Sequence, residues 1–185
     1  MIKSEESGLQ LHFLFKTQNI KIKCMNNQSK KTQQTKEILE KSGVEIIIKQ
    51  FPDSTRTAQE AASAIGCEVS QIAKALIFKS KDSGKPILVI AGGSNRVDLQ
   101  KVENLLKESV EKADADFVLE QTGFVIGGVP PFGHATSITP FIDEDLFQHK
   151  EIWASAGTPH SVFKLTPENL TEISNGKVVD IKLIN

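Results

Sequence analysis

The sequence has few cysteines, no long apolar run and almost no net charge. Its two cysteines, Cys24 and Cys67, form neither a CxxC pair nor a dense framework, and the start carries no secretory signal, so we expect free thiols in a reducing cytoplasm. No run of 18 or more apolar residues is present, so no membrane partner is expected. The chain has 22 Lys plus Arg against 23 Asp plus Glu, whereas proteins that wrap duplexes carry a large basic excess. The balance argues against DNA binding and against extensive binding of a phosphate backbone.

Signature motifs of common enzyme classes are also absent. There is no GxSxG elbow, Walker loop, GxGxxG or HExxH, and the four histidines are not spaced as a metal set. The turn Gly92-Gly93-Ser94 lacks the remaining glycine of a dinucleotide fingerprint. The run Asp143-Glu144-Asp145 is typical of a solvated helix start, where carboxylates meet the positive end of the helix dipole, and we give it no catalytic role. We therefore expect neither a metal nor a cofactor.

Length and charge distribution suggest one globular domain behind a short tail. The 185 residues, 39% hydrophobic and 24% charged, fit a single compact core. Residues 1–28 show no clean period and are interpreted as a tail, while residues 29–185 are expected to form one domain. Met25 is an alternative initiator, which would make the preceding residues an upstream extension; the intact mass of the native protein decides this. Residues 1–50 carry a net charge of +4 and the rest −5, so only the N-terminal part is basic.

Local patterns predict short helices and strands in mixed order. Helices are expected over residues 31–42, 58–65 and 99–106, in a shorter segment capped by Asp114, and from Thr166 onward. Strands are expected over residues 44–51, 75–79, 87–90, 138–142, 152–156, 161–165 and 178–183. Thr57 and Glu60 fit a capping box, and Gly66 stands where that helix should end. Because these elements form no regular βαβ series, we predict a mixed, strongly curved sheet with helices packed on it.

Lys74 is unusual because it stands at the entry to an apolar strand. On a strand, Lys74 would point to the same face of the sheet as Leu76 and Phe78. If Leu76 and Phe78 face the core, the Lys74 ammonium points toward the core as well. A buried ammonium needs an anionic partner, a ligand or a route to solvent. The alternative is that Lys74 lies in the preceding turn and points outward.

Two Gly/Pro segments could present backbone groups to a ligand. The first, residues 127–134, holds three glycines and two prolines, and adjacent amides in such a loop can hold an oxyanion. The second, residues 156–160, is a rigid turn between two expected strands. On the residues alone, a simple change of chain direction explains both segments equally well.

Four segments in order carry a resemblance: TRTAQEAASAIGC from Thr55, QIAKALIF from Gln71, IGGVPPFGH from Ile126 and AGTPHSVFKLTPENL from Ala156. Over roughly residues 31–183 the chain resembles the YbaK/EbsC family of aminoacyl-tRNA deacylases, which are related to the editing domain of bacterial prolyl-tRNA synthetases. The resemblance implies an α/β (α+β) fold with a mixed, barrel-like sheet. It also implies hydrolysis of the ester that joins a wrong amino acid to the terminal adenosine of a tRNA.

The resemblance also assigns site residues. Lys74 matches the characteristic lysine of the family, Gly127 and Pro131 match its GxxxP pattern, and Gly157 matches a second glycine edge of the pocket. The implied catalytic residues are Lys74, Gly127 and Gly128. The implied substrate-binding residues are Thr55, Pro130, Pro131, Gly133, Gly157, Thr158, Pro159 and His160. A catalytic role for His160 stays open because its motif varies.

These assignments lead to a mechanistic hypothesis and to two functional classes. The ester carbonyl would dock on backbone groups of Gly127, Gly128 and Gly157, Lys74 would neutralise a phosphate or the oxyanion, and water or a ribose hydroxyl would assist. We expect a metal-independent trans-editing enzyme that contacts the acceptor end of a tRNA. Among possible substrates we rank tRNA(Pro) carrying a small wrong amino acid first, because the family is associated with that tRNA. A synthetase or elongation factor could supply further contacts, and the basic N-terminal part either touches the acceptor stem or is merely solvated. The alternative is a non-catalytic regulatory module that binds tRNA or protein.

Overall fold

The computed structural model describes residues 29–43 and 47–184. The helices are α2 (Lys30–Lys41), α3 (Ala58–Ile65), α4 (Leu99–Leu106), α5 (Ala115–Thr122) and α6 (Pro167–Ser174), with the short 3-10 helices η1 (Val69–Gln71) and η2 (Glu144–Gln148). The strands are β1 (Ile47–Gln50), β2 (Ile72–Ser80), β3 (Pro86–Gly92), β4 (Val110–Lys112), β5 (Phe141–Asp143), β6 (Ile152–Thr158), β7 (Ser161–Leu165) and β8 (Lys177–Val179).

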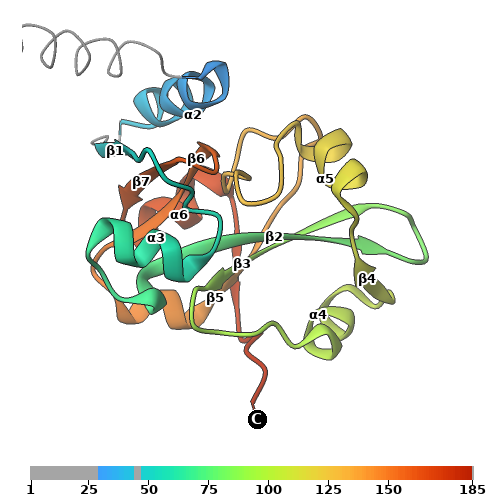
Figure 1. Ribbon diagram of the computed structural model, residues 1–185. Helices are drawn as coiled ribbons and strands as arrows, with labels where there is room; N and C mark the ends of the chain where they lie inside the picture. The colour runs from blue at the N-terminus through green and yellow to red at the C-terminus, as the bar shows by residue number, and fades with distance from the viewer. Residues whose placement is uncertain (1–28, 44–46, 185) are drawn as a thin grey trace, which may run out of the picture. The chain divides into compact units, whose positions relative to one another are not determined.

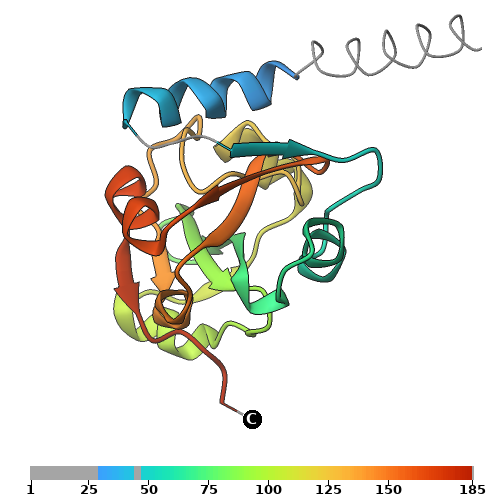
Figure 2. The same ribbon diagram turned by 90° about the vertical axis from the view of Figure 1, so that its left-hand side faces the viewer.

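Eight strands in the described part of the chain form one mixed sheet, in the order β1-β7-β6-β2-β3-β5-β8. Strand β4 lies off this path and pairs with the end of β2. The β2–β3, β1–β7 and β6–β7 pairs are antiparallel, whereas β2–β6, β3–β5 and β5–β8 are parallel. Figure 1 shows the long β2–β3 ladder through the middle of the fold, and Figure 2 shows β1 beside β7. The predicted mixed α+β architecture is confirmed.

Helix α3 begins and ends as its sequence predicts. The Thr57 hydroxyl accepts the Glu60 amide at 3.1 Å, while the Glu60 carboxylate accepts the Thr57 amide at 3.1 Å. These two bonds satisfy amides that would otherwise lack partners at the helix start. Gly66 ends the helix at a φ of +80°, a conformation that suits glycine. The capping box therefore fixes the position of the chain that leads into the helix.

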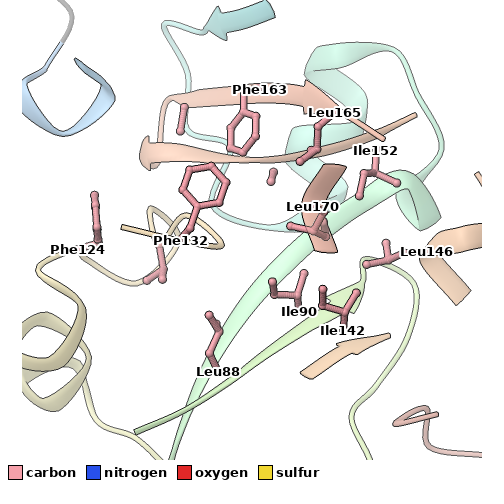
Figure 3. Packing of buried hydrophobic residues seen from close by; sticks show 14 of the residues in the cluster. Leu88, Ile90, Phe124, Phe132, Ile142, Leu146, Ile152, Phe163, Leu165 and Leu170 are labelled. Carbon is pink, nitrogen blue, oxygen red and sulfur yellow. The ribbon is translucent and has the colours of Figure 1, made fainter. Parts of the chain in front are cut away.

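The sheet buries apolar side chains on both faces. Alternate β2 residues such as Ala73 and Ile77 pack in the largest cluster, and Leu76 and Phe78 pack in a second cluster with Val102 of α4. Figure 3 shows residues of the largest cluster, which come from strands, loops, the 3-10 helix η2 and helix α6: Leu88, Ile90, Phe124, Phe132, Ile142, Leu146, Ile152, Phe163, Leu165 and Leu170. Because both faces are covered, a polar side chain in the middle of β2 must be accommodated by specific partners.

Several predicted strand limits are wrong. The strand expected over 138–142 begins only at Phe141, immediately after Pro140, which has no N–H to donate to a ladder. The strand expected over 178–183 is limited to Lys177–Val179, with an isolated bridge between Val97 and Lys182 beyond it. Strand β4 was not predicted. Strand β1 covers Ile47–Gln50 of the expected 44–51, and residues 44–46 lie outside the described residues.

The predicted tail also lies outside the described residues. This applies to residues 1–28 and therefore to Cys24 and to the alternative start at Met25. Cys67 is a free thiol, as expected. In the part of the chain that the structure describes, no helix is long and apolar enough to cross a membrane.

His134 is a buried titratable group that should make stability depend on pH. Its Nε2 lies 2.7 Å from the Pro130 carbonyl and its ring meets Phe124 edge to face. Burial lowers the pKa of His134, and the Pro130 hydrogen bond opposes this in part. The unfolded chain therefore binds the proton more readily, so stability should fall as the pH drops below about 6.5, the unperturbed histidine value.

The change His134→Gln should flatten this acid loss. Urea unfolding gives the free energy of unfolding of variant and parent at pH 8 and at pH 5. The loss between the two pH values is compared between the proteins, because the contribution of carboxylates that titrate in both proteins cancels in that comparison. His160→Gln, which alters an exposed histidine, is the matched control. An unchanged pH profile in His134→Gln would contradict the assignment.

Candidate active site

A cavity of about 220 Å³ lies over β2 and is lined by α3, the loop after α5, and strands β6 and β7. Its walls include the side chains of Ile72, Ala73, Trp153 and Val162, so most of the surface is apolar. Three of the predicted site residues line it: Lys74, Thr55 and Gly127. The fold thus brings together residues from three separate sequence motifs.

Lys74 projects from β2 on the same face as Leu76, as its parity predicts, and it is half-buried. Its Nζ donates to the Gly93 carbonyl at 3.1 Å and to the Asn95 carbonyl through a short hydrogen bond. An ammonium has three N–H donors, so one remains after these two bonds. Burial lowers the pKa of Lys74, and the negative charge of Asp143 partly offsets this. The inward orientation, not the outward alternative, is the one observed.

Asp143 organises the turn that holds Lys74. Its side chain is 1% exposed, and Oδ2 accepts the Gly92 amide at 3.0 Å and the Asn95 side-chain amide at 2.8 Å. The Asn95 amide also donates to Asp145, which pairs with Lys182 at 2.8 Å. The prediction that residues 143–145 form a solvated helix start is therefore wrong for Asp143, although Asp143 does cap η2.

Gly93 shows why this turn needs a small residue. A Cβ at Gly93 would overlap the Val69 carbonyl oxygen and lie 2.9 Å from the Ala58 Cβ. The backbone of the turn is thus packed directly against η1 and α3. This close approach fixes the Gly93 carbonyl that accepts from Lys74.

The loop around Gly127 forms another wall of the cavity. Gly127 has a φ of +83°, and its amide has no hydrogen-bond acceptor in the described part of the chain. The Gly128 amide already donates to Val125 at 2.9 Å, and Gly128 packs closely against Thr158 and Pro159. Of the two glycine amides, Gly127 is therefore the one that remains available to a substrate.

The Gly157–His160 turn supports the cavity wall from outside. The Gly157 amide donates to Ser155 Oγ at 3.3 Å, and the Pro159 carbonyl accepts from both the amide and the hydroxyl of Thr55, at 2.6 and 2.9 Å. Gly157, Thr158, Pro159 and His160 do not line the cavity. His160 is exposed, with Nδ1 3.2 Å from the Asp53 carbonyl.

The remaining predicted residues lie elsewhere. Pro131 and Gly133 line a second cavity of about 390 Å³ with residues 134–138 and the end of α6, and Pro130 contacts His134. The structure therefore does not bring Pro130, Pro131 and Gly133 to the cavity that contains Lys74.

Lys74 and Arg56 are the only titratable side chains among the described residues that line the first cavity. None of the described residues that line it is His, Cys, Asp or Glu, and its hydroxyls come from Thr55, Thr57, Ser155 and Ser161. Among the described residues, no group of three His, Cys, Asp or Glu could hold a metal ion. The chemistry available to a substrate is thus two cations, several hydroxyls, a free amide and an apolar wall.

Arg56, Asn95 and Asp143 belong to this region and were not predicted. Arg56 is in the TRTAQ motif beside the predicted Thr55, so its position in the sequence could have identified it. Asn95 and Asp143 act on Lys74 through tertiary contacts between distant segments. No local pattern in the sequence reports such contacts.

The change Gly127→Ala should impair activity more than a comparable glycine change elsewhere. At a φ of +83° an alanine is strained by about 1–2 kcal/mol, and its Cβ would lie 2.5 Å from Arg56 Cγ. Gly84→Ala is the matched control because Gly84 has a φ of +69° with nothing within 4 Å of an added Cβ. Both variants should lose the stability that the strained φ costs, Gly127→Ala should lose more because of the overlap with Arg56, and only Gly127→Ala should lose turnover in its folded state. Equal turnover in the two variants would contradict a role for this loop.

The fold and cavity define an α+β protein with a small, largely apolar pocket that carries cations and whose described lining holds no His, Cys, Asp or Glu. The family model for the aminoacyl-tRNA editing domain matches residues 52–173, which is well over half of the chain. The chain belongs to the aminoacyl-tRNA editing domain family.

Individual relatives agree with this assignment. The chain is similar to the uncharacterized protein YwhH of Bacillus subtilis, with 34% identity over 131 residues, 71% of this chain and 83% of YwhH. It is 26% identical over 126 residues to EbsC of Enterococcus faecalis, provisionally named a Cys-tRNA(Pro)/Cys-tRNA(Cys) deacylase, covering 68% of this chain and 76% of EbsC. A proline–tRNA ligase of Caldicellulosiruptor bescii is 27% identical over 135 residues, 72% of this chain but only 23% of the ligase.

A solved structure described as a provisional trans-editing enzyme for prolyl-tRNA synthetase has a TM-score of 0.79 and 39% identity. The match covers 85% of this chain and all of that one. The chain is thus an aminoacyl-tRNA editing domain, its activity is the editing or deacylation of aminoacyl-tRNA, and its substrate is an aminoacyl-tRNA. The resemblance inferred from the four sequence motifs is confirmed.

Proposed function

We propose that the chain is a metal-independent trans-editing deacylase that removes a small wrong amino acid from tRNA(Pro). The observation that carries the proposal is Lys74, which lines the cavity and whose ammonium is held by two carbonyls with one N–H left to donate. The names of EbsC and of the prolyl trans-editing structure support tRNA(Pro). The apolar cavity of about 220 Å³ supports a small side chain.

The proposed reaction is hydrolysis of the aminoacyl ester. Water attacks the ester carbonyl, and the Lys74 ammonium and the Gly127 amide stabilise the oxyanion that forms. The bond between the carbonyl carbon and the ribose oxygen then breaks, and the proton lost by the water passes to that ribose oxygen. Lys74 supplies the positive charge, so we assign no step to a metal ion.

Selection of the amino acid would come from the size of the cavity. One methylene is worth only about 1–3 kcal/mol, so the cavity discriminates weakly between similar side chains. The chain matches only 23% of the ligase length. In the ligase, the remaining part of the protein can therefore contribute to tRNA selection, whereas this chain lacks a match to that part. We therefore propose that a synthetase partner supplies part of the tRNA selection.

Multiple-turnover hydrolysis tests the proposal. Labelled tRNA(Pro) carrying alanine, cysteine, serine or proline is incubated with a small fraction of enzyme, and released amino acid is followed. We expect many turnovers on one or more small wrong amino acids and little on proline. Enzyme treated with EDTA and then returned to the Mg²⁺ buffer that tRNA needs should keep its rate.

Two outcomes would overturn the proposal in different ways. No turnover by folded protein on any substrate would favour the alternative, a non-catalytic module that binds tRNA or protein. Loss of rate after EDTA, restored by a transition metal, would overturn metal independence alone.

A further inference from the structure

The rim of the Lys74 cavity has a different chemistry from its interior. Arg56 and Ile126 both line the cavity, yet both side chains are exposed, Ile126 at 54%. A cavity of about 220 Å³ has room for a small aminoacyl group, whereas the attached nucleotide must remain outside it. The rim residues are therefore the ones that the terminal nucleotide of an acceptor strand would meet.

Arg56 is held in place at this rim through its stem and not through its charge. A Cβ on Gly127 would lie 2.5 Å from Arg56 Cγ and 3.2 Å from its Cβ, so the stem lies across the Gly127 backbone. The following residue, Thr57, is fixed by the α3 capping box. The guanidinium itself makes no hydrogen bond or ion pair with any described residue. Its five donors are free for an incoming anion.

Charge and residue type point to a phosphate. The lining of the cavity contains two cations, Lys74 and Arg56, and no carboxylate among the described residues. The chain has only two arginines against 20 lysines, and one of them stands at this rim. A guanidinium fork matches two phosphate oxygens at once, which an ammonium does not.

We infer that Arg56 binds the phosphate of the 3′-terminal nucleotide and that Ile126 packs against its base, so that the attached aminoacyl group enters the cavity toward Lys74. The inference rests on the proposed function, because it assumes an aminoacylated acceptor end as substrate. It makes Arg56 a substrate-binding residue that acts on the nucleotide and not on the ester.

Two small esters test this directly. One is the alanyl, cysteinyl or seryl ester of adenosine, which has no phosphate, and the other is the same ester of adenosine 5′-monophosphate. Arg56→Gln should lower kcat/KM about tenfold on the phosphate-bearing ester, mainly through KM, and leave the adenosine ester unchanged. Arg56→Lys should fall between the parent and Arg56→Gln. Ile126→Ser should lower kcat/KM on both esters alike.

Lys112→Gln is the matched control, since it removes one exposed cation on β4, which pairs with the far end of β2. It should alter neither ester. On intact mischarged tRNA, Arg56→Gln should reduce the slope of log(kcat/KM) against log[salt] by about 0.7, the value for one contact to a single strand.

Each outcome has a clear meaning. An equal effect of Arg56→Gln on both esters, or none on either while the parent is active, would overturn the inference and leave the proposed function intact. A parent enzyme that hydrolyses neither ester nor mischarged tRNA would overturn the proposed function, and the inference with it. Unfolding midpoints equal to the parent exclude loss of fold in the variant.

Discussion

Lys74→Ala should lower kcat/KM for deacylation by about a hundredfold or more while leaving the protein folded. Lys74 lines the cavity, and losing one preorganised oxyanion donor costs about 3 kcal/mol. Removing a half-buried ammonium also relieves its desolvation, which offsets part of the loss of its hydrogen bonds to the Gly93 and Asn95 carbonyls. Steady-state kinetics on mischarged tRNA and urea unfolding measure the two effects separately.

Lys79→Ala is the matched control for this result. Lys79 lies on the same strand, over the ring of Phe117 at 5.2 Å, and does not line the cavity. The variant should lose only the cation–π contact, which lowers the free energy of unfolding by about 0.5–1 kcal/mol, and should keep its activity. A Lys74→Ala variant with the kcat/KM of the parent would contradict the catalytic assignment of Lys74.

The pH profile gives a second readout on Lys74. Because burial lowers the pKa of Lys74, the ammonium loses its proton at a lower pH than an ordinary lysine. After subtraction of uncatalysed hydrolysis, kcat should therefore decline on the alkaline side before an exposed lysine would titrate. Lysines such as Lys79 should have no influence on that decline.

Asp143→Ala should lower the free energy of unfolding by about 3 kcal/mol and reduce activity as well. The change leaves the Gly92 amide and the Asn95 side-chain amide without their buried acceptor, and each unsatisfied donor costs about 1–3 kcal/mol. The turn that carries the Gly93 and Asn95 carbonyls then loses its anchor, so Lys74 loses its position. Urea unfolding monitored by Trp153 fluorescence measures the stability, with kinetics at a temperature where the variant stays folded.

Asp145→Ala separates this effect from simple loss of a carboxylate. Asp145 contacts the same Asn95 amide and pairs with Lys182, but its side chain is 26% exposed. An exposed ion pair is worth about 0–1 kcal/mol, so this variant should remain close to the parent. Equal destabilisation by the two changes would contradict the anchoring role of Asp143.

Local signals in the sequence predicted the helices well. The Thr57–Glu60 capping box, the Asp114 cap and the helix start at Thr166 all occur as predicted, because each depends on contacts within one helical turn. Strand limits were predicted less well, since they depend on a partner strand. Strand β4 is defined by its pairing with the end of β2, and its three residues are too few to show an alternating apolar pattern.

The same distinction holds for the site. The parity of Lys74 left an inward and an outward orientation open, and the structure has it on the same face as Leu76. Of the predicted residues in the loop around Gly127, only Gly127 itself lines the cavity. The role of Asp143 was not visible, because its partners at Gly92 and Asn95 are about fifty residues away in sequence. A carboxylate in an acidic run resembles a solvated one until the tertiary contacts are known.

The pairing of β1 with β7 has a consequence for how the chain is made. Gln50 pairs with Ser161 and Ile47 with Lys164, so β1 is synthesised long before its partner strand. Until residues 161–165 emerge from the ribosome, β1 remains an unpaired strand that another chain could join. Strand β7 also pairs with β6, so a chain that stops before residue 161 leaves β1 without a partner and exposes the edge of β6 that does not pair with β2. Premature termination in this region should therefore give an aggregating product and not a smaller folded one.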